Sequence, residues 1–415
     1  MLYKRWTRTA RLHRNEPALR DAAAGRHWTF GELFEAGERE KTGPASAVFP
    51  SGHSPEFILQ VLAGWREGRV LCPLEPGQAH PLLSGAPAHC VHFKRTSATT
   101  GGARLIAFTA RQLAADADQI VRTMGLRSDW PNVGVISLAH SYGFSNLVLP
   151  LLLHGIPLVL AAGPLPEMVR RAAGSEGNVT IPAVPAIWRA WHEARAIPAN
   201  TRLAISAGAP LSLKLEQEIF KAGGLKIHNF YGASECGGIA FDASDAPRED
   251  AAIAGMPLDG VQVSLNEDGC LIVQSDAVGE TYWPPAPPSP GNRVFQTFDL
   301  AELKDGKVLL HGRLNDLINV AGRKVSPETI ESVLLSHPAI RDCLVLGVPS
   351  RDKERGQTIA AIIASDAAAE ELKAFALERM PAWQAPRLWH FVDSLESNAR
   401  GKLSRAQWRK KFGGS

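Results

Sequence analysis

The feature that most restricts how this sequence can fold is an alternation of helix-length segments with short apolar runs across residues 1–242. Residues 109–124 place apolar side chains on one helical face, and Thr109 is a favourable N-cap. Residues 133–138 then form an apolar run typical of a buried strand. Helices and buried strands in alternation are typical of a parallel sheet covered by helices. The sequence therefore predicts an α/β fold for this part of the chain.

Polar or small residues follow three of the predicted strands. Residues 139–143 have the sequence AHSYG, residues 206–210 have SAGAP, and residues 231–235 have YGASE. Parallel α/β sheets bind ligands at the carboxyl ends of their strands. Small residues there leave room for a flat ligand, so these three segments are predicted to contribute to a ligand site.

A polar loop at residues 94–104, with the sequence KRTSATTGGAR, is a candidate phosphate-binding loop. Its hydroxyl groups donate hydrogen bonds to anionic oxygens, and its glycines let backbone N–H groups approach them. Lys94, Arg95 and Arg104 add positive charge at both ends. The loop lacks the Gly-Lys-Ser/Thr sequence of the common phosphate-binding loop of nucleotide hydrolases. A plain polar connection between two strands is the alternative for this segment taken alone.

The pattern changes after residue 242 to short strands separated by Gly and Pro, which predicts a β-rich subdomain over about 243–312. Residues 282–291 are rich in proline and predict a stiff surface loop. A boundary near residues 312–316 precedes a part of α+β character, in which Ser326-Pro327-Glu328 is a helix start. The prediction is a large domain, residues 1–312, followed by a small one, residues 313–415.

Composition and charge limit the classes of protein that fit. The 415 residues include 45 basic and 42 acidic ones, and this near-neutral balance gives no reason to expect nucleic-acid or membrane-surface binding. The longest apolar stretch, residues 147–162, is interrupted by Pro150 and Pro157 and is too short to span a bilayer. No signal peptide is expected at the N-terminus. The five cysteines form no CxxC pair, and we expect them to be reduced and mostly buried in a cytoplasmic protein.

Five short segments match, in order, the signature motifs of one family. They are residues 96–101 (T-S-G-T-T-G in the family), 231–235 (Y-G-x-T-E), 295–299 (Y-x-T-G-D), 312–325 (G-R-x-D-D-x-I-K-x-x-G-x-R-I) and 401–405 (G-K-x-x-R). The chain thus resembles the adenylate-forming enzymes, which include acyl- and aryl-CoA synthetases, luciferases and peptide-synthetase adenylation domains. The resemblance implies an α/β fold with a large N-terminal domain of helix-covered sheets, a β-rich subdomain and a small mobile C-terminal lid.

The resemblance also implies the reaction and its cofactors. A small carboxylic acid is activated with ATP and Mg²⁺ as an acyl-adenylate. The acyl group then passes to the thiol of CoA or to the phosphopantetheine of an acyl carrier protein. The segment 139–146 contains no acidic residue. Because a buried ammonium without a partner is costly, an α-amino acid is not expected, and the apolar residues Phe144, Leu147 and Trp188 favour an aryl or fatty acyl group.

Each matched residue receives a role from the resemblance. The phosphates of ATP are assigned to Thr96, Ser97, Thr99, Thr100 and Gly101, and the nucleoside to Gly208, Ala209, Tyr231, Gly232, Asp299 and Arg313. The catalytic residues are Lys402, Glu235 and Ser234, with Glu235 also the Mg²⁺ ligand. The acyl pocket is assigned to His140, Tyr142, Gly143 and Ala207, the hinge to Asn315, and the thiol tunnel to Gly322.

Three substitutions depart from the family pattern. Ala98 and Phe298 stand where glycines are expected, and Phe298 is predicted to crowd the ribose site; Arg104 stands at the position of a lysine. The phosphate loop also lies earlier than usual, so the first subdomain is predicted to be truncated. These departures keep open a non-catalytic nucleotide-binding relative. An adenylating enzyme whose second step forms an amide or a lactone is another alternative.

Overall fold

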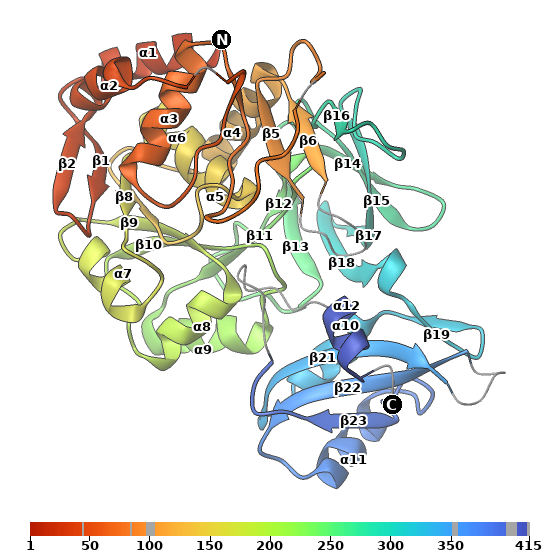
Figure 1. Ribbon diagram of the computed structural model, residues 1–415. Coiled ribbons are helices and arrows are strands. Elements are labelled where there is room, and N and C mark those ends of the chain that lie inside the picture. The colour runs from red at the N-terminus through yellow and green to blue at the C-terminus, as the bar shows by residue number, and fades with distance from the viewer. Residues whose placement is uncertain (44, 84, 97–103, 351–355, 396–404, 413–415) are drawn as a thin grey trace.

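The computed structural model describes residues 1–415 except 44, 84, 97–103, 351–355, 396–404 and 413–415 (Figure 1). Within these residues, one sheet of thirteen strands runs through the large N-terminal part. Six parallel strands, in the order β1-β8-β7-β9-β10-β11, form one half of it, and β2 pairs antiparallel at the edge. Their bounds are β1 Pro17–Asp21, β2 Arg26–Thr29, β7 Asn132–Gly134, β8 Leu158–Leu160, β9 Val179–Ala183, β10 Thr201–Ser206 and β11 Ile227–Ala233.

Helices cover both faces of these parallel strands. Figure 1 shows α1 Leu2–Leu12, α2 Phe30–Arg39, α3 Pro55–Arg66, α4 Ala110–Met124 and α6 Leu149–His154 on one side, and α7 Pro166–Ala173, α8 Pro185–Glu193 and α9 Leu213–Gly223 on the other. The short α5 Ser141–Gly143 leads directly into a π-helix, Phe144–Val148. Apolar residues of both layers, including Trp6, Trp188 and Trp191, are fully buried in one core. The predicted helix-covered parallel sheet is therefore confirmed.

The other half of the large sheet is antiparallel and follows β11 without a break. β12 pairs with β11, and the order continues β13-β18-β17-β15-β14. The bounds are β12 Gly237–Phe241, β13 Ile253–Pro257, β14 Gln262–Leu265, β15 Cys270–Gln274, β17 Val294–Lys304 and β18 Lys307–Arg313. This half supplies the β-rich character that the sequence predicts after residue 242.

A second sheet of five strands carries the ends of the candidate phosphate loop. Its order is β16-β6-β5-β4-β3, with bounds β3 Ala47–Val48, β4 Val70–Leu71, β5 His92–Arg95, β6 Leu105–Phe108 and β16 Thr281–Trp283. The strand β16 corrects one prediction. Tyr282 and Trp283 begin the proline-rich segment expected to be a surface loop, yet both pair with β6 and Tyr282 is buried.

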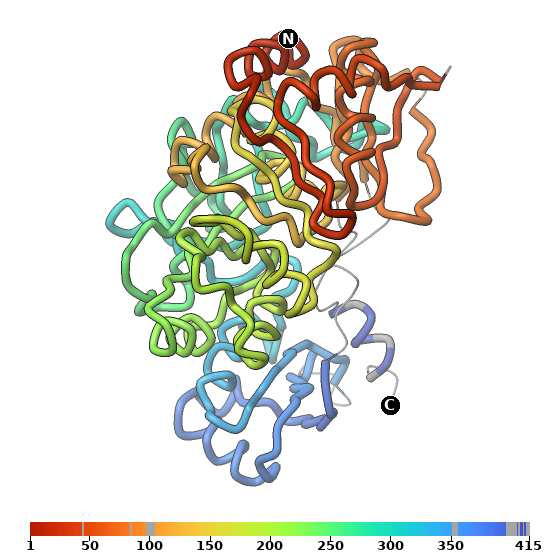
Figure 2. The backbone as a smooth tube through the Cα atoms, turned by 90° about the vertical axis from the view of Figure 1, so that its left-hand side faces the viewer, coloured from red at the N-terminus to blue at the C-terminus, as the bar shows by residue number. Residues whose placement is uncertain are grey.

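The C-terminal part has its own core and lies at one end of the molecule in both views (Figures 1 and 2). It contains a 3₁₀ turn Leu314–Asp316, β19 Ile318–Val320, β20 Arg323–Val325, α10 Pro327–Leu335, β21 Ile340–Pro349, β22 Gln357–Ser365, α11 Ala369–Arg379, β23 Leu388–Phe391 and α12 Arg405–Phe412. Lys214 of α9 donates to the carbonyl of Pro338 at 3.0 Å, and Arg189 of α8 donates to that of Arg341 at 3.0 Å. These contacts join it to the helical side of the large part.

Several local predictions agree with the structure. Thr109 caps α4 as predicted and forms a capping box with Gln112. Thr29 caps α2 in the same way, with Glu32 as its partner. All five cysteines are free and buried. Among the described residues, no helix combines the length and the apolar character needed to cross a bilayer.

Candidate active site

Tyr231, Asp299 and Arg313 form a hydrogen-bonded group where β11 meets the antiparallel half of the sheet. Asp299 and Arg313 are cross-strand partners on β17 and β18, and Arg313 Nε donates to Asp299 Oδ1 at 2.7 Å. The Tyr231 hydroxyl donates to Asp299 Oδ2 at 2.5 Å. Asp299 raises the pKa of Arg313, while burial and then Asp299 raise that of Tyr231. Both donors therefore stay protonated, and each carboxylate oxygen keeps a lone pair for a further donor.

Phe298 was predicted to crowd the ribose site, but it does not crowd this group. Its side chain is exposed, whereas that of Asp299 is buried. Successive side chains of a strand point to opposite faces of the sheet, so Phe298 faces away from the carboxylate of Asp299.

Glu235 lies in the turn between β11 and β12, close to the second sheet. Its Oε1 accepts a hydrogen bond from the Tyr282 hydroxyl at 2.9 Å. Burial raises the pKa of Glu235, although this hydrogen bond acts in the opposite direction. The prolines that follow Tyr282 favour a loop in the sequence, whereas the β-branched and aromatic residues Thr281, Tyr282 and Trp283 are the signal for the strand that forms.

The two ends of the candidate phosphate loop are fastened to each other. The backbone N–H of Thr96 donates to the carbonyl of Arg104 at 2.9 Å, and the N–H of Arg104 donates to Thr96 Oγ1 at 3.0 Å. The predicted phosphate contacts Ser97, Thr99, Thr100 and Gly101, and the departure at Ala98, lie outside the described residues. The guanidinium of Arg104 stands 5.1 Å from the ring centre of Tyr282.

Lys94 is not a charge of the loop, contrary to the sequence analysis. Its side chain is 1% exposed, and Nζ donates to Asp116 Oδ2 of α4 at 3.0 Å and to Ser145 Oγ at 3.1 Å. Ser145 Oγ also donates to Asp116 Oδ2 at 2.5 Å, and the N–H of Gly238 donates to Oδ1 at 3.2 Å. We call Lys94, Asp116 and Ser145 the turn-end network, because it reaches the β11–β12 hairpin next to its turn.

The predicted acyl-pocket residues lie where β9, β10 and α5 meet. The half-buried Tyr142 directs its hydroxyl toward the carbonyls of Ala183 and Ile205, at 3.5 and 3.4 Å. A Cβ at Gly143 would lie 1.9 Å from the carbonyl oxygen of Ser137, so close backbone packing already requires glycine there. Ala207 is buried, and its N–H donates to the carbonyl of Ala183 at 3.3 Å. The structure thus brings these residues together at the ends of the parallel strands.

Hydroxyl groups connect the predicted acid segment with the predicted catalytic turn. Ser141 Oγ lies 2.7 Å from Ser234 Oγ, and Ser234 is adjacent to Glu235. His140 precedes Ser141 at the N-cap of α5, and its carbonyl accepts from the N–H of Phe144 at 2.8 Å.

Three apolar residues used to infer the acid belong to the core. Phe144, Leu147 and Trp188 are at most 1% exposed. Phe144 packs against Phe57 and His92, and the indole N–H of Trp188 donates to the carbonyl of Ile205 at 3.2 Å. Core packing accounts for their apolar character, so they carry no information about the acid.

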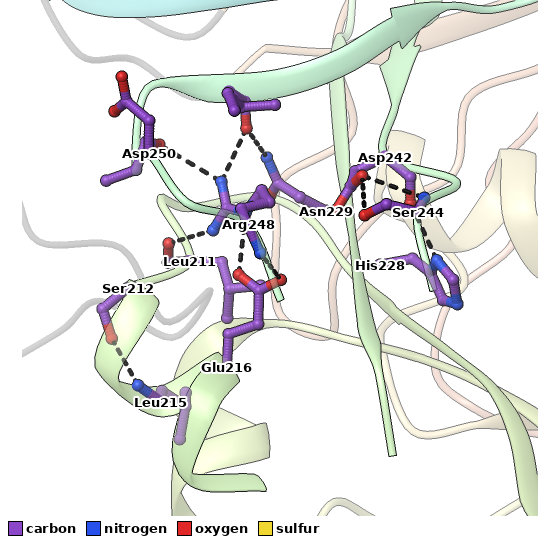
Figure 3. Close-up of polar contacts among 12 residues, drawn as sticks. Leu211, Ser212, Leu215, Glu216, His228, Asn229, Asp242, Ser244, Arg248 and Asp250 are labelled. Atoms are coloured by element: carbon purple, nitrogen blue, oxygen red, sulfur yellow. Dashed lines mark hydrogen bonds and ion pairs between the residues drawn. The ribbon is translucent and has the colours of Figure 1, made fainter. Parts of the chain in front are cut away.

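A four-charge cluster lies next to Leu211, which follows the segment that contains Gly208 and Ala209, and Figure 3 shows three of its members, Glu216, Asp242 and Arg248. Arg248 donates from Nη2 to the carbonyl of Leu211 at 2.7 Å and from Nε to Glu216 Oε2 at 2.9 Å. Lys226 contacts both Glu216 and Asp242, the latter at 2.7 Å. We call Glu216, Lys226, Asp242 and Arg248 the open-end network, because Lys226 directly precedes β11 and Asp242 directly follows β12.

Two glycines of the predicted nucleoside site have backbone reasons to be glycine. Gly208 has φ +87°, a conformation that side chains rarely adopt. A Cβ at Gly232 would lie 2.7 Å from the carbonyl oxygen of Gly237. Gly208, just after β10, and Gly232, next to Tyr231, are both exposed, so a ligand can contact them.

The C-terminal motif residues are divided between described and undescribed segments. Lys402 lies outside the described residues. Arg405, three positions later, contacts Glu331 and Glu328 at 2.8 Å and Asp316 at 3.6 Å. Asn315 lies in the 3₁₀ turn beside that aspartate, and Gly322 occupies the β19–β20 turn with φ +81°. Arg405 therefore fixes the C-terminal helix to the segment predicted to be the hinge.

Comparisons with known proteins agree with this arrangement. The AMP-binding enzyme family model matches residues 84–283, and the AMP-binding enzyme C-terminal domain model matches residues 329–402. A probable 2-succinylbenzoate–CoA ligase of Mycobacterium tuberculosis is 28% identical over 77% of this chain and 84% of its own length. A feruloyl-CoA synthase of Amycolatopsis is 26% identical over 87% of this chain and 78% of its own length.

A solved structure shares the fold across nearly the whole chain. It is o-succinylbenzoate CoA synthetase from Bacillus subtilis in complex with its acyl-adenylate intermediate, with a TM-score of 0.82, 21% identity and 99% coverage of both chains. The chain therefore belongs to the adenylate-forming superfamily of AMP-binding enzymes. Within that superfamily it is an AMP-forming acid–thiol ligase.

Proposed function

We propose that this chain activates an aromatic carboxylic acid with ATP and then transfers the acyl group to the thiol of CoA. In the first step the carboxylate oxygen attacks the α-phosphorus and pyrophosphate leaves; in the second the thiolate attacks the acyl carbonyl and AMP leaves. The observation that carries the proposal is the Tyr231–Asp299–Arg313 group on the large sheet together with Glu235 in the turn that directly follows β11. It offers a ribose acceptor and a separate carboxylate for the phosphate end.

The nucleoside end is assigned to the residues around Asp299. Its two oxygens already hold Tyr231 and Arg313, which fix the carboxylate plane, and their remaining lone pairs would accept the ribose hydroxyls. Gly208, Ala209 and Gly232 would flank the adenine. Holding the nucleotide in this way converts the attack on phosphorus into a nearly unimolecular step.

Glu235 suits the Mg²⁺ that accompanies ATP. Magnesium in such enzymes is usually held by one or two carboxylates together with substrate phosphates and water. Among the described residues there is no group of three or more His, Cys, Asp or Glu side chains able to enclose a metal. A single oriented carboxylate fits that pattern, because the remaining ligands come from ATP. When bound, the metal would neutralise phosphate charge, while Glu235 holds its position.

The aromatic acid and the acceptor rest on the relatives. The curated relatives described above are named for 2-succinylbenzoate and ferulate, both aromatic acids, and for CoA. In this chain the acid would lie against the α5 segment, near Tyr142 and the small residues Gly143 and Ala207. An acyl carrier protein remains the alternative acceptor, and Asn315 and Gly322 would serve the reorientation that admits the thiol.

ATP–pyrophosphate exchange across a panel of aryl and fatty acids tests the first step. We expect exchange that depends on an aryl acid and falls about 10²–10³-fold in Lys402→Ala, because a charge lost at the transition state costs that much. Glu193→Gln, an exposed change at the end of α8, is the control and should exchange normally. ATP binding without exchange for any acid would instead indicate a non-catalytic nucleotide-binding protein.

The second step is tested by supplying the adenylate-forming enzyme with alternative acceptors. CoA is expected to give a thioester, and a pantetheinylated carrier protein is expected to give none. Acyl transfer only to the carrier protein, or only to an amine with formation of an amide, would contradict the CoA assignment.

A further inference from the structure

Both carboxylates of the candidate site are held by a tyrosine hydroxyl. The chain has four tyrosines. Tyr231 donates to Asp299 at 2.5 Å, and Tyr282 donates to Glu235 at 2.9 Å. The first pair combines two residues of family motifs, whereas Tyr282 lies outside every motif that the sequence analysis used. Its contact with Glu235 therefore needs an explanation of its own.

Tyr282 is held firmly enough to orient another side chain. It is 7% exposed and pairs with Ile106 in the β16–β6 ladder. Its N–H donates to Ser289 Oγ at 2.9 Å. A buried ring with a fixed backbone loses little further entropy on directing its hydroxyl at a partner.

A residue shortly before Tyr282 also forms a hydrogen bond with the backbone of Glu235. The N–H of Gly279 donates to the carbonyl of Glu235 at 2.8 Å, and that of Glu280 donates to the carbonyl of Ala107 at 2.8 Å. A Cβ at Gly279 would lie 2.7 Å from Ile106 Cγ2, so the approach is as close as packing allows. Residues 279–282 thus fix both the carbonyl and the carboxylate of Glu235 to β6.

The ring of Tyr282 also meets a cation at the end of the predicted phosphate loop. The Arg104 guanidinium stands 5.1 Å from the ring centre, within range of a cation–π contact. Arg104 immediately precedes β6, the strand that Tyr282 pairs with. One side chain therefore touches an anionic group through its hydroxyl and a cationic group through its ring.

We propose that Tyr282 is a positioning residue that orients Glu235 toward the metal of the ATP complex and keeps Arg104 beside it. This inference rests on the proposed function, because it gives Glu235 the metal-binding role assigned there. A partner that orients a metal ligand typically contributes about 10–100-fold to metal affinity. The same range is expected for the hydroxyl of Tyr282.

The test compares Tyr282→Phe, which removes only the hydroxyl, with Tyr3→Phe. Tyr3 also donates to a glutamate, Glu38, but on the surface of α1 and α2, so it is a matched control. Mn²⁺ binding is measured by electron paramagnetic resonance in the presence of a non-hydrolysable ATP analogue and without any acid. We expect about 10-fold weaker Mn²⁺ binding in Tyr282→Phe and no change in Tyr3→Phe.

A double-mutant cycle separates positioning from a general structural effect. If Tyr282 acts through Glu235, the change Tyr282→Phe has no further effect on Mn²⁺ binding in a Glu235→Gln background. In exchange assays Tyr282→Phe should raise the Mg²⁺ concentration for half-maximal rate and leave the KM for the acid unchanged. Wild-type Mn²⁺ affinity in Tyr282→Phe, or an equal loss in the Glu235→Gln background, would overturn the proposal.

Failure of the proposed function gives a different result. If the wild-type chain binds Mn²⁺ with the ATP analogue but exchanges pyrophosphate with no acid, the adenylation proposal fails while the binding test of Tyr282 still stands. If exchange is normal and the Mn²⁺ affinity of Tyr282→Phe is unchanged, only the inference about Tyr282 fails.

Discussion

The turn-end and open-end networks hold opposite ends of the β11–β12 hairpin, and they are built differently. At the turn, one cation, Lys94, faces one anion, Asp116, and the neutral donors Ser145 and Gly238 complete the contacts. At the open end, two cations and two anions are joined, and Glu216 contacts both cations. The first network has a single ionic link, whereas the second is centred on one shared carboxylate.

This difference shows what each network can contribute. A buried ion pair adds little net stability compared with an apolar pair, but the loss of one partner leaves a costly unpaired charge. The turn-end network joins the strand that leads into the phosphate loop, the π-helix after α5 and the hairpin beside Glu235. The open-end network instead joins α9 and the segment after β12. The former aligns parts of the site, and the latter braces the strand from which the site projects.

The largest effect is expected from breaking the shared carboxylate. Glu216→Gln leaves Lys226 and Arg248 buried with only Asp242 as an anion, and we expect a loss of about 3–5 kcal/mol in the free energy of unfolding. Urea unfolding followed by tryptophan fluorescence measures it. The matched control is Glu218→Gln, an exposed position on the same helix, which should change the midpoint little. Equal midpoints for both variants would show that the open-end network does not depend on Glu216.

A smaller effect is expected at the turn end. Lys94→Met leaves Asp116 with the donors Ser145 and Gly238, so we expect a loss of about 3 kcal/mol, the lower end of the range for a broken buried pair. The double variant Lys94→Met/Asp116→Asn should recover most of it, since no charge then remains buried. The same urea midpoints measure both. A double variant no more stable than Lys94→Met would contradict the view of this network as a single ion pair.

The smallest effect is expected in a third, half-exposed network in which Arg5 and His154 meet Asp118. Burial opposes ionisation of Asp118, but hydrogen bonds from His154 and Arg5 outweigh it and lower the pKa to about 2. Because the pKa of Asp118 is lower in the folded chain than in the unfolded chain, its ionisation stabilises the fold at pH values above the pKa of the unfolded chain. This stabilisation is lost as the pH falls toward 2. With Asp118 41% exposed, we expect about 1 kcal/mol.

Unfolding of wild type and Asp118→Asn at pH 7, 4 and 3 checks this expectation. The difference between the two proteins should be full at pH 7 and smaller at pH 3, because Asp118 of the unfolded wild type is then largely protonated. A difference that stays constant with pH would show that the contribution of Asp118 is not ionic.

The parts of the fold that depend on neighbours in sequence were predictable. Thr29 and Thr109 cap helices because each hydroxyl reaches an N–H three residues on, so the signal lies within one turn of chain. The alternation of helices and buried strands likewise specified the parallel half of the sheet. The motif residues Tyr231, Asp299 and Arg313 were found by resemblance, and the structure brings them together.

What could not be predicted depends on partners far along the chain. Lys94 looked like a loop charge because its partner Asp116 lies on α4 and no local pattern links the two. Tyr282 was assigned to a loop, since only pairing with β6 turns its segment into a strand. Phe298 seemed to crowd the ribose site until its face of β17 was known.

The large sheet changes from parallel to antiparallel pairing at a single strand. The strand β11 pairs parallel with β10 on one side and antiparallel with β12 on the other. The strand β11 is therefore the boundary between the parallel and antiparallel halves of the sheet. Tyr231 lies in this strand and Glu235 in the turn directly after it, so the spacing between them depends only on this short stretch of chain. Loops on the helical side can be shortened, and those on the antiparallel side lengthened, while this spacing stays the same.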